Sequence, residues 1–326
     1  MASLISNKLN PPKDTKPSFQ GRNVIVTGAN VGLGFECAIK FVQLGADRVI
    51  LGVRTLSKGE EAKQQIETRT GRKGCVAVWH LDLLDYESMR AFAKRVENDL
   101  SHLDIVVLNA GIISYKYSQT MYGWEKTLQT NVFSTVLLGL LLMPKLKASK
   151  TADFTPVLEL VSSATHAPPH TTSLRSETAP LAAYNTSKGY NFKDQYGHSK
   201  LFLEYGHTGL THLAQNQQTG KPDVYVVSVC PGITQSEFTR DFKSLWYMQP
   251  VIMLVSLVMR AAEEGSRTYI SGIALGEKGH GRFWTWDEIK EPAPLLRNKE
   301  LQAKVWREII DGLKKDVPEV ELLAQA

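Results

Sequence analysis

The chain has 326 residues, of which 43% are hydrophobic and 22% are charged. This composition is typical of a soluble globular protein, and the length is sufficient for one large α/β domain. The net charge of +5 is small and no block of like charges marks a nucleic-acid arm, so no nucleic-acid partner is expected. The cysteines Cys37, Cys75 and Cys230 lie far apart, which predicts no metal site and favours a reducing compartment, here the cytoplasm.

Two segments differ from the rest of the chain. Residues 1–20 lack the apolar core of a signal peptide, and we predict a flexible lead-in to a single domain over residues 21–326. Leu245–Met259 is apolar but interrupted by polar residues and proline, and it is shorter than the roughly 20 residues that span a bilayer. We interpret it as part of a substrate-covering segment over residues 233–265, with a shallow peripheral membrane contact as the alternative.

Elsewhere, short β-branched runs alternate with helical segments, which is typical of βαβ units. The sequence therefore predicts an α/β fold: a Rossmann-type, doubly wound parallel sheet of about seven strands with a C-terminal extension. Strands are expected at Asn23–Thr27, Arg48–Gly52, Cys75–His80, Ile105–Leu108, Val157–Val161, Tyr225–Val229 and around Arg282–Trp284. Helices are expected near Gly32–Gln43, Lys58–Arg69, Glu87–Asp99, Trp124–Lys147, Gly197–Ala214 and Glu300–Lys314.

A glycine-rich turn follows the first predicted strand. Residues without a Cβ let backbone N–H groups approach a pyrophosphate at a helix N-terminus. Glycines in this pattern can also form a mere turn, but their position between a strand and a helix favours a dinucleotide site. The residues of this turn that we assign to the cofactor site are Gly28, Asn30, Gly32, Leu33 and Gly34.

The second predicted strand ends without the acidic residue that would bind a ribose 2′-hydroxyl. Arg54 follows it instead, with Lys58 one turn later. The planar guanidinium of Arg54 suits a 2′-phosphate; alternatively, Arg54 is a surface residue paired with Glu60 or Glu61. The missing acid favours NADP(H) over NAD(H).

Two further strand ends complete the predicted cofactor site. Asp82 and Leu83 follow the third strand, where Asp82 can accept from an adenine amino group, cap the next helix, or do both. After the fourth strand come the small residues Asn109, Ala110 and Gly111, which allow a cofactor to approach the backbone closely.

The chemistry is expected at Tyr196 and Lys200, which are four residues apart and so share one face of a helix. The ordinary tyrosine pKa of about 10 is high for proton exchange near neutrality, and we expect Lys200 and an oxidised nicotinamide to lower it. Tyr196 then serves as general acid or base. Tyr184 and Lys188 have the same spacing but precede a loop-like run, so we favour the later pair.

These motifs together resemble the short-chain dehydrogenase/reductase family over about Gly21 to Trp284. The stretches Leu51-Gly52-Val53-Arg54 and Tyr196-Gly197-His198-Ser199-Lys200, with the C-terminal extension, most resemble its retinol-dehydrogenase-like branch. The resemblance implies hydride exchange between a nicotinamide cofactor and an alcohol/carbonyl pair. It also implies Ser163, rather than Ser162, as the substrate-binding hydroxyl, and Asn131 as the holder of a water linked to Lys200. Beyond the sixth strand, Pro231, Gly232 and Thr234 join the cofactor site.

The family covers its substrate with the region that follows Thr234, which here is aromatic and apolar and includes Phe238, Phe242 and Trp246. A lipophilic small molecule is therefore expected, such as a retinoid, a steroid, or a polyketide or terpenoid intermediate, although the segment can also be core or a subunit contact. Gly206 and Gly209 permit close helix packing, so a homodimer and a monomer both remain open. The alternative function is a dinucleotide-binding scaffold without hydride transfer.

Overall fold

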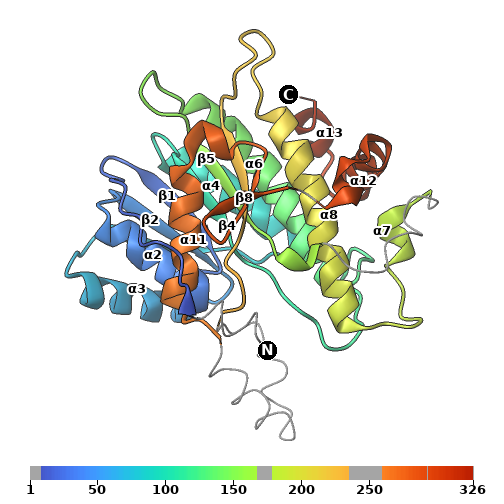
Figure 1. Cartoon of the computed structure of the whole chain (residues 1–326), viewed down its shortest axis with the longest axis horizontal. Coiled ribbons are helices and arrows are strands. Elements are labelled where there is room, and N and C mark those ends of the chain that lie inside the picture. The colour runs from blue at the N-terminus through green and yellow to red at the C-terminus, as the bar shows by residue number, and fades with distance from the viewer. Residues whose placement is uncertain (1–8, 167–177, 235–258, 292, 326) are drawn as a thin grey trace, which may run out of the picture.

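The computed structural model describes residues 9–166, 178–234, 259–291 and 293–325. They form the predicted Rossmann-type fold around an eight-stranded sheet of order β3-β2-β1-β4-β5-β6-β7-β8, in which β8 alone runs antiparallel (Figure 1). The strands are β1 Asn23–Thr27, β2 Arg48–Val53, β3 Val76–His80, β4 Ile105–Leu108, β5 Val157–Val161, β6 Tyr225–Cys230, β7 Phe283–Thr285 and β8 Glu288–Lys290. The prediction of seven parallel strands is confirmed, and β8 is an addition to it.

The strand β8 was missed because its turn has an unusual composition. Trp286 and Asp287 connect β7 to β8 with φ values of 60° and 56°. Two-residue hairpin turns that need positive φ usually contain glycine or asparagine, and neither stands here.

Helices cover both faces of the sheet (Figure 1). Along β1, Val24 and Val26 pack into one apolar cluster and Ile25 into the other, so the middle of the strand is apolar on both faces. One face carries α2 Gly32–Gln43, α3 Leu56–Thr70 and α11 Ala262–Ala274; the other carries α4 Tyr86–Asp99, α6 Thr135–Ala148 and α8 Phe192–Leu213. Shorter helices are α5 Lys126–Leu128, α7 Pro180–Ala183 and α13 Val320–Leu323, and α12 Lys299–Leu313 packs on α8.

The predicted helix Trp124–Lys147 is interrupted. It consists of α5, a π-helical turn η1 over Gln129–Ser134, and α6. A π turn inserts a residue into the helical ladder, and such turns are frequent at functional sites. The stretch Lys126–Ala148 is long and apolar enough to cross a membrane, but 89% of its apolar window is buried inside the protein, as in a core helix.

The helix α8 begins earlier than the sequence predicted. The Asn191 side chain caps the helix by accepting hydrogen bonds from Lys193 N at 2.9 Å and Asp194 N at 3.4 Å. The helix therefore begins at Phe192, five residues before the predicted start. Further along the helix, a Cβ on Gly209 would collide with Trp306 of α12, and one on Gly206 would lie 2.5 Å from a Val136 methyl. Close packing at both glycines is thus intramolecular, and they lend no support to a homodimer.

The lead-in is docked over its described part, contrary to the predicted flexibility. Pro12 and Phe19 are buried, and the Asn10 carbonyl accepts a 2.6 Å hydrogen bond from Arg260. Asp14 lies 3.5 Å from Lys40 of α2. These partners are more than 20 residues away along the chain, so local composition could not reveal them. The apolar segment Leu245–Met259 lies outside the described residues, apart from Met259.

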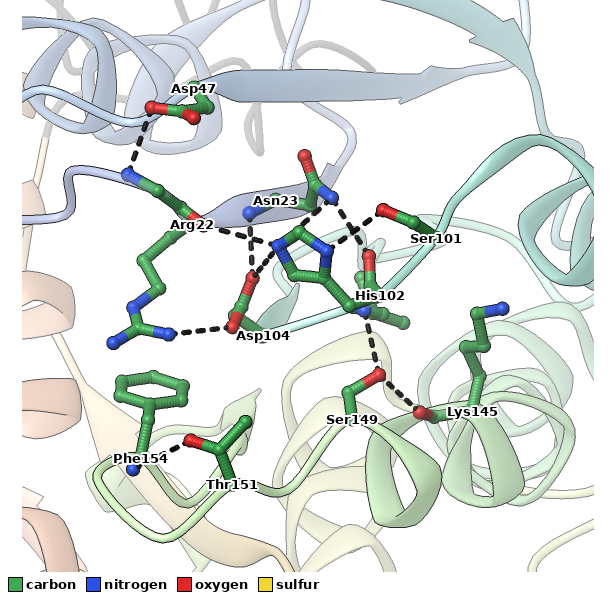
Figure 2. A network of polar contacts seen from close by, with 12 residues as sticks. Arg22, Asn23, Asp47, Ser101, His102, Asp104, Lys145, Ser149, Thr151 and Phe154 are labelled. Atoms are coloured by element: carbon green, nitrogen blue, oxygen red, sulfur yellow. Dashed lines mark hydrogen bonds and ion pairs between the residues drawn. The ribbon is translucent and has the colours of Figure 1, made fainter.

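A polar network joins the amino ends of β1 and β4 (Figure 2). The buried Asp104 carboxylate accepts hydrogen bonds from Arg22 Nη1 at 3.1 Å and from Asn23 N at 2.8 Å. His102 Nε2 lies 3.2 Å from the same carboxylate, and Ser101 Oγ lies 2.9 Å from His102 Nδ1. We call this set of five residues the amino-edge network.

Candidate active site

A cavity of about 770 Å³ lies along the carboxyl edge of the sheet, where open parallel sheets bind their ligands. Gly34 and Asn131 are predicted site residues that do not line it. The other predicted residues all do: Gly28, Asn30, Gly32, Leu33, Arg54, Lys58, Asp82, Leu83, Asn109, Ala110, Gly111, Ser163, Tyr196, Lys200, Pro231, Gly232 and Thr234.

The glycine-rich turn fits closely against the loop after β4. Gly28 has a φ of +64°, which suits glycine, and a Cβ there would lie 3.1 Å from Ala110 Cβ. A Cβ on Gly34 would lie 2.5 Å from Asn109 Nδ2 and 2.8 Å from the Gly28 carbonyl oxygen. Gly34 is therefore required for packing within the turn and not for lining the cavity.

Asn109 ties three elements together beneath the cavity. Its Nδ2 donates to the Thr27 carbonyl at 2.8 Å, and its Oδ1 accepts from the Tyr269 hydroxyl of α11 at 3.0 Å. The Ala110 N–H donates to Thr27 Oγ1 at 2.9 Å. Tyr269 also lines the cavity, yet the sequence carried no signal for it because α11 itself was not predicted.

At the β2 end of the cavity, Arg54 is exposed. Glu60 pairs with Lys63 at 3.9 Å, and among the described residues no carboxylate pairs with Arg54. The alternative of a surface arginine paired with Glu60 or Glu61 is therefore not observed in the described part of the chain. The guanidinium is available to an anionic ligand.

Asp82 does not cap the helix that follows it, so that alternative is wrong. Its Oδ1 accepts from Leu84 N at 3.0 Å, which closes a local turn. The cap of α4 is Asp85, whose side chain accepts from Glu87 N at 3.0 Å. The Asp82 turn shapes the cavity wall that Leu83 completes.

Tyr196, Ser163 and Lys200 meet at the other end of the cavity. Tyr196 shares a hydrogen bond with Ser163, whose Oγ also accepts from Thr165 Oγ1 at 2.9 Å. Lys200 Nζ lies 5.7 Å from the centre of the Tyr196 ring and donates to the Val161 carbonyl at 2.8 Å. By contrast, Tyr184 is not among the residues that line this cavity; its ring centre lies 3.9 Å from that of His198, with the ring planes tilted by 35°.

Asn131 lies in the π turn behind this cluster. Its Oδ1 accepts from Ile112 N and its Nδ2 donates to Ile112 O, both at 2.9 Å, and Nδ2 also donates to Ser199 Oγ at 3.0 Å. A Cβ on Gly111 would lie 3.1 Å from Asn131 Oδ1 and 3.7 Å from Lys200 Nζ. Asn131 thus anchors the cavity-lining backbone at Ile112 close to Lys200.

Burial shifts both central groups toward their neutral forms. It lowers the pKa of the Lys200 ammonium to about 8, against the effect of the Glu204 carboxylate. It raises the pKa of the Tyr196 phenol, against the effect of the hydrogen bond with Ser163. In the protein alone, desolvation of the phenolate thus outweighs its neighbours, and the expected lowering of the Tyr196 pKa by Lys200 together with an oxidised nicotinamide stays a prediction.

His166, close to the cavity, serves packing. His166 is buried, its Nδ1 lies 2.8 Å from the Ser163 carbonyl, and its ring lies 4.6 Å from that of Phe283. No cluster of potential metal ligands occurs among the described residues.

The cavity fits a dinucleotide. At the start of α2, Gly28 and Gly32 bring backbone without side chains to the cavity wall, where N–H groups at a helix N-terminus suit a pyrophosphate. Arg54 and Lys58 supply positive charge at one end, and Tyr196 and Ser163 supply hydroxyls at the other. Fold and cavity define a dinucleotide-binding protein of the Rossmann type.

Comparisons with known proteins specify the family. The family model described as short chain dehydrogenase matches residues 22–173. Short-chain dehydrogenase/reductase ffsI of Aspergillus flavipes is 37% identical over 96% of this chain and 92% of its own length. The corresponding protein phmF of Phaeosphaeria nodorum is 37% identical over 97% of this chain and 93% of its own.

Solved structures share the fold. A protein from Mycobacterium paratuberculosis has a TM-score of 0.65 at 23% identity, covering 91% of this chain and 95% of its own. The RhlG/NADP complex of Pseudomonas aeruginosa has a TM-score of 0.61 at 21% identity, with coverage of 82% and 95%.

The chain therefore belongs to the short-chain dehydrogenase/reductase family. It is an oxidoreductase with a nicotinamide dinucleotide as cofactor and a small molecule as substrate. The relatives are named at family level, so the retinol-dehydrogenase-like branch stays a prediction.

Proposed function

We propose that the protein is an NADP(H)-dependent oxidoreductase that interconverts an alcohol and a ketone or aldehyde on a lipophilic small molecule, with Tyr196 as general acid/base. The observation that carries this proposal is the arrangement of Tyr196 and Ser163, which share a hydrogen bond at the cavity beside Lys200. When bound, the nicotinamide supplies or accepts the hydride.

The chain's own residues handle the proton. The Tyr196 hydroxyl gives its proton to the substrate oxygen in reduction and takes it back in oxidation. The Ser163 hydroxyl orients that oxygen and stabilises the charge that develops on it. The Lys200 ammonium stabilises the Tyr196 phenolate left after proton donation and holds the cofactor ribose.

The preference for NADP(H) rests on Arg54 and Lys58. Both line the cavity, and both are exposed at its β2 end, where a 2′-phosphate is the matching anion. The solved structures of the Pseudomonas aeruginosa RhlG and of a short chain dehydrogenase from Shigella flexneri contain NADP, which supports the same choice.

A lipophilic substrate is supported by the cavity wall near Tyr196. Ile112, Ile113 and Ile233 line it, and Ile233 is 47% exposed. Retinoids, steroids and polyketide or terpenoid intermediates are the substrate classes to test. We also propose a cytoplasmic location, which the three free thiols support.

The test replaces Tyr196 with phenylalanine. Because general acid–base catalysis contributes roughly 10²- to 10⁴-fold, we expect turnover of lipophilic ketones to fall by about that factor. Binding of NADPH, followed by quenching of the six tryptophans, should not change, since the ring and its packing remain.

The matched control is Tyr184→Phe, which removes a hydroxyl from the pair with the same spacing. Its turnover should equal that of the wild type. Normal turnover by Tyr196→Phe would contradict the assignment. If the wild type binds NADPH but none of the carbonyl compounds tested causes NADPH to be oxidised, the scaffold function replaces this proposal.

A further inference from the structure

Three ionisable side chains form a buried row on α8. Lys200, Glu204 and His207 are spaced four and three residues apart, so they share one face of the helix. Each is only 4% exposed. The row extends from the cavity, which Lys200 lines, toward the amino end of β6, where His207 Nε2 lies 3.4 Å from the Val226 carbonyl oxygen.

The Glu204 carboxylate is held in place. Its Oε1 accepts a 2.5 Å hydrogen bond from Ser228 Oγ of β6, and its Oε2 lies 3.7 Å from His207 Nδ1. Burial lowers the pKa of His207, which leaves that ring neutral near pH 7. His207 therefore does not balance a charge on Glu204.

The other groups around Lys200 are neutral. From β5 comes the Val161 carbonyl, which accepts its 2.8 Å hydrogen bond, and from η1 comes the amide of Asn131. From β6 comes the Cys230 thiol, and from α8 the Tyr196 phenol; burial raises the pKa of both. Among the described residues, Glu204 is thus the acidic side chain that acts on Lys200.

An ammonium taken out of water is costly unless an opposite charge and hydrogen bonds compensate it. We propose that Glu204 is a positioning residue for Lys200: its carboxylate, oriented by Ser228, is the counter-charge that keeps the buried ammonium protonated. Glu204 then acts on Tyr196, and so on the reaction, only through Lys200. This inference depends on the proposed function for the catalytic role of Lys200.

The experiment is an NMR titration of the full-length protein with isotope-labelled lysine, in which Lys200→Met identifies the Lys200 signal. Glu204→Gln keeps the shape and the hydrogen bond with Ser228 but removes the charge. Because an opposite charge nearby favours the ammonium, the midpoint of the Lys200 titration in Glu204→Gln should lie about 1 pH unit or more below that of the wild type. The limb of the pH profile of kcat/KM that reports Lys200 should move with it.

The matched control is Glu159→Gln. Glu159 lies on β5 and faces α11, on the opposite face of the sheet from α8: a Cβ on Gly272 would lie 2.8 Å from Glu159 Oε2. Burial raises its carboxyl pKa well above the ordinary value. Glu159 is not among the groups whose charge acts on Lys200, so its replacement should leave the midpoint of the Lys200 titration in place. An unchanged midpoint in Glu204→Gln, or an equal shift in Glu159→Gln, overturns the proposal.

If Glu204→Gln does not fold, the double variant Lys200→Met/Glu204→Gln decides. A counter-charge role predicts that removing the stranded ammonium restores folding, whereas continued misfolding overturns the proposal. The titration needs no substrate, so it tests the role of Glu204 independently of the proposed function. A wild type without turnover but with a Glu204-dependent Lys200 midpoint refutes the proposed function and leaves the charge pair standing.

Discussion

At the amino edge of the sheet, the Asp104 carboxylate accepts hydrogen bonds from Arg22 and Asn23 and lies beside His102 (Figure 2). At the carboxyl edge, Lys200 is also buried, yet the hydrogen bond that holds it ends on the neutral carbonyl of Val161. At the first site the carboxylate contacts the Arg22 guanidinium directly, whereas at the second the direct partner is neutral and burial disfavours the ammonium.

The difference separates stability from function. Polar groups that complete one another's hydrogen bonds hold β1 and β4 in register and have little left for a ligand. Groups near the cavity are anchored by backbone atoms and retain capacity for substrate and cofactor. Such groups make proteins less stable than they could be, which is a recurrent cost of active sites.

The largest expected effect is a loss of stability when the amino-edge network is broken. Asp104→Asn removes the charge that Arg22 and His102 face, and because Asp104 is buried, we expect the free energy of unfolding to fall by about 3 kcal/mol. Urea denaturation at pH 7 measures it. Asp99→Asn, which breaks the exposed pair with Arg95, should cost less than about 1 kcal/mol. Equal effects of the two substitutions would abolish the distinction between the edges.

A pH-dependent effect is expected from Lys200. Its pKa of about 8 in the folded protein lies below the ordinary 10.5, so between these pH values the unfolded chain carries a proton that the folded protein has released. The unfolding free energy of the wild type should therefore rise with pH in this window relative to Lys200→Met, by on the order of 3 kcal/mol or less.

Urea denaturation at several pH values between 7 and 10 checks this. Lys188→Met is the control, because Lys188 is exposed and should give a difference that does not change with pH. A flat difference for Lys200→Met would show that its ammonium is not disfavoured by the site.

The smallest effect concerns the cofactor end of the cavity. Arg54→Ser removes the cation that we assign to the 2′-phosphate, so the Kd for NADPH should rise about 10-fold, or 1.4 kcal/mol, while that for NADH changes little. Tryptophan quenching measures both. Arg95→Ser removes an arginine outside this cavity and should affect neither. A parallel loss for both cofactors would refute the assignment of Arg54.

Sequence reasoning succeeded where a structure is determined locally. The bounds of β1 and α2 agree with the prediction because the apolar run, the glycine turn and the amphipathic segment lie within 21 residues. Predictions from the sequence were wrong or incomplete where the residue that makes the contact lies far away along the chain. The docking of residues 9–20 depends on Arg260 and Lys40, and the close packing at Gly209 depends on Trp306.

Some features of the active site could likewise be predicted from the sequence, and others could not. The sequence by itself determined the order of motifs, the strand ends at which they lie, and the shared helical face of Tyr196 and Lys200, because each follows from short-range periodicity. Only the tertiary structure decided the role of Asp85 as the α4 cap in place of Asp82, the contact of Tyr269 with Asn109, and the burial of Lys200 beside Glu204. Burial and the direction of a pKa shift depend on which distant residues exclude water from a side chain. Local sequence patterns do not reveal those long-range contacts.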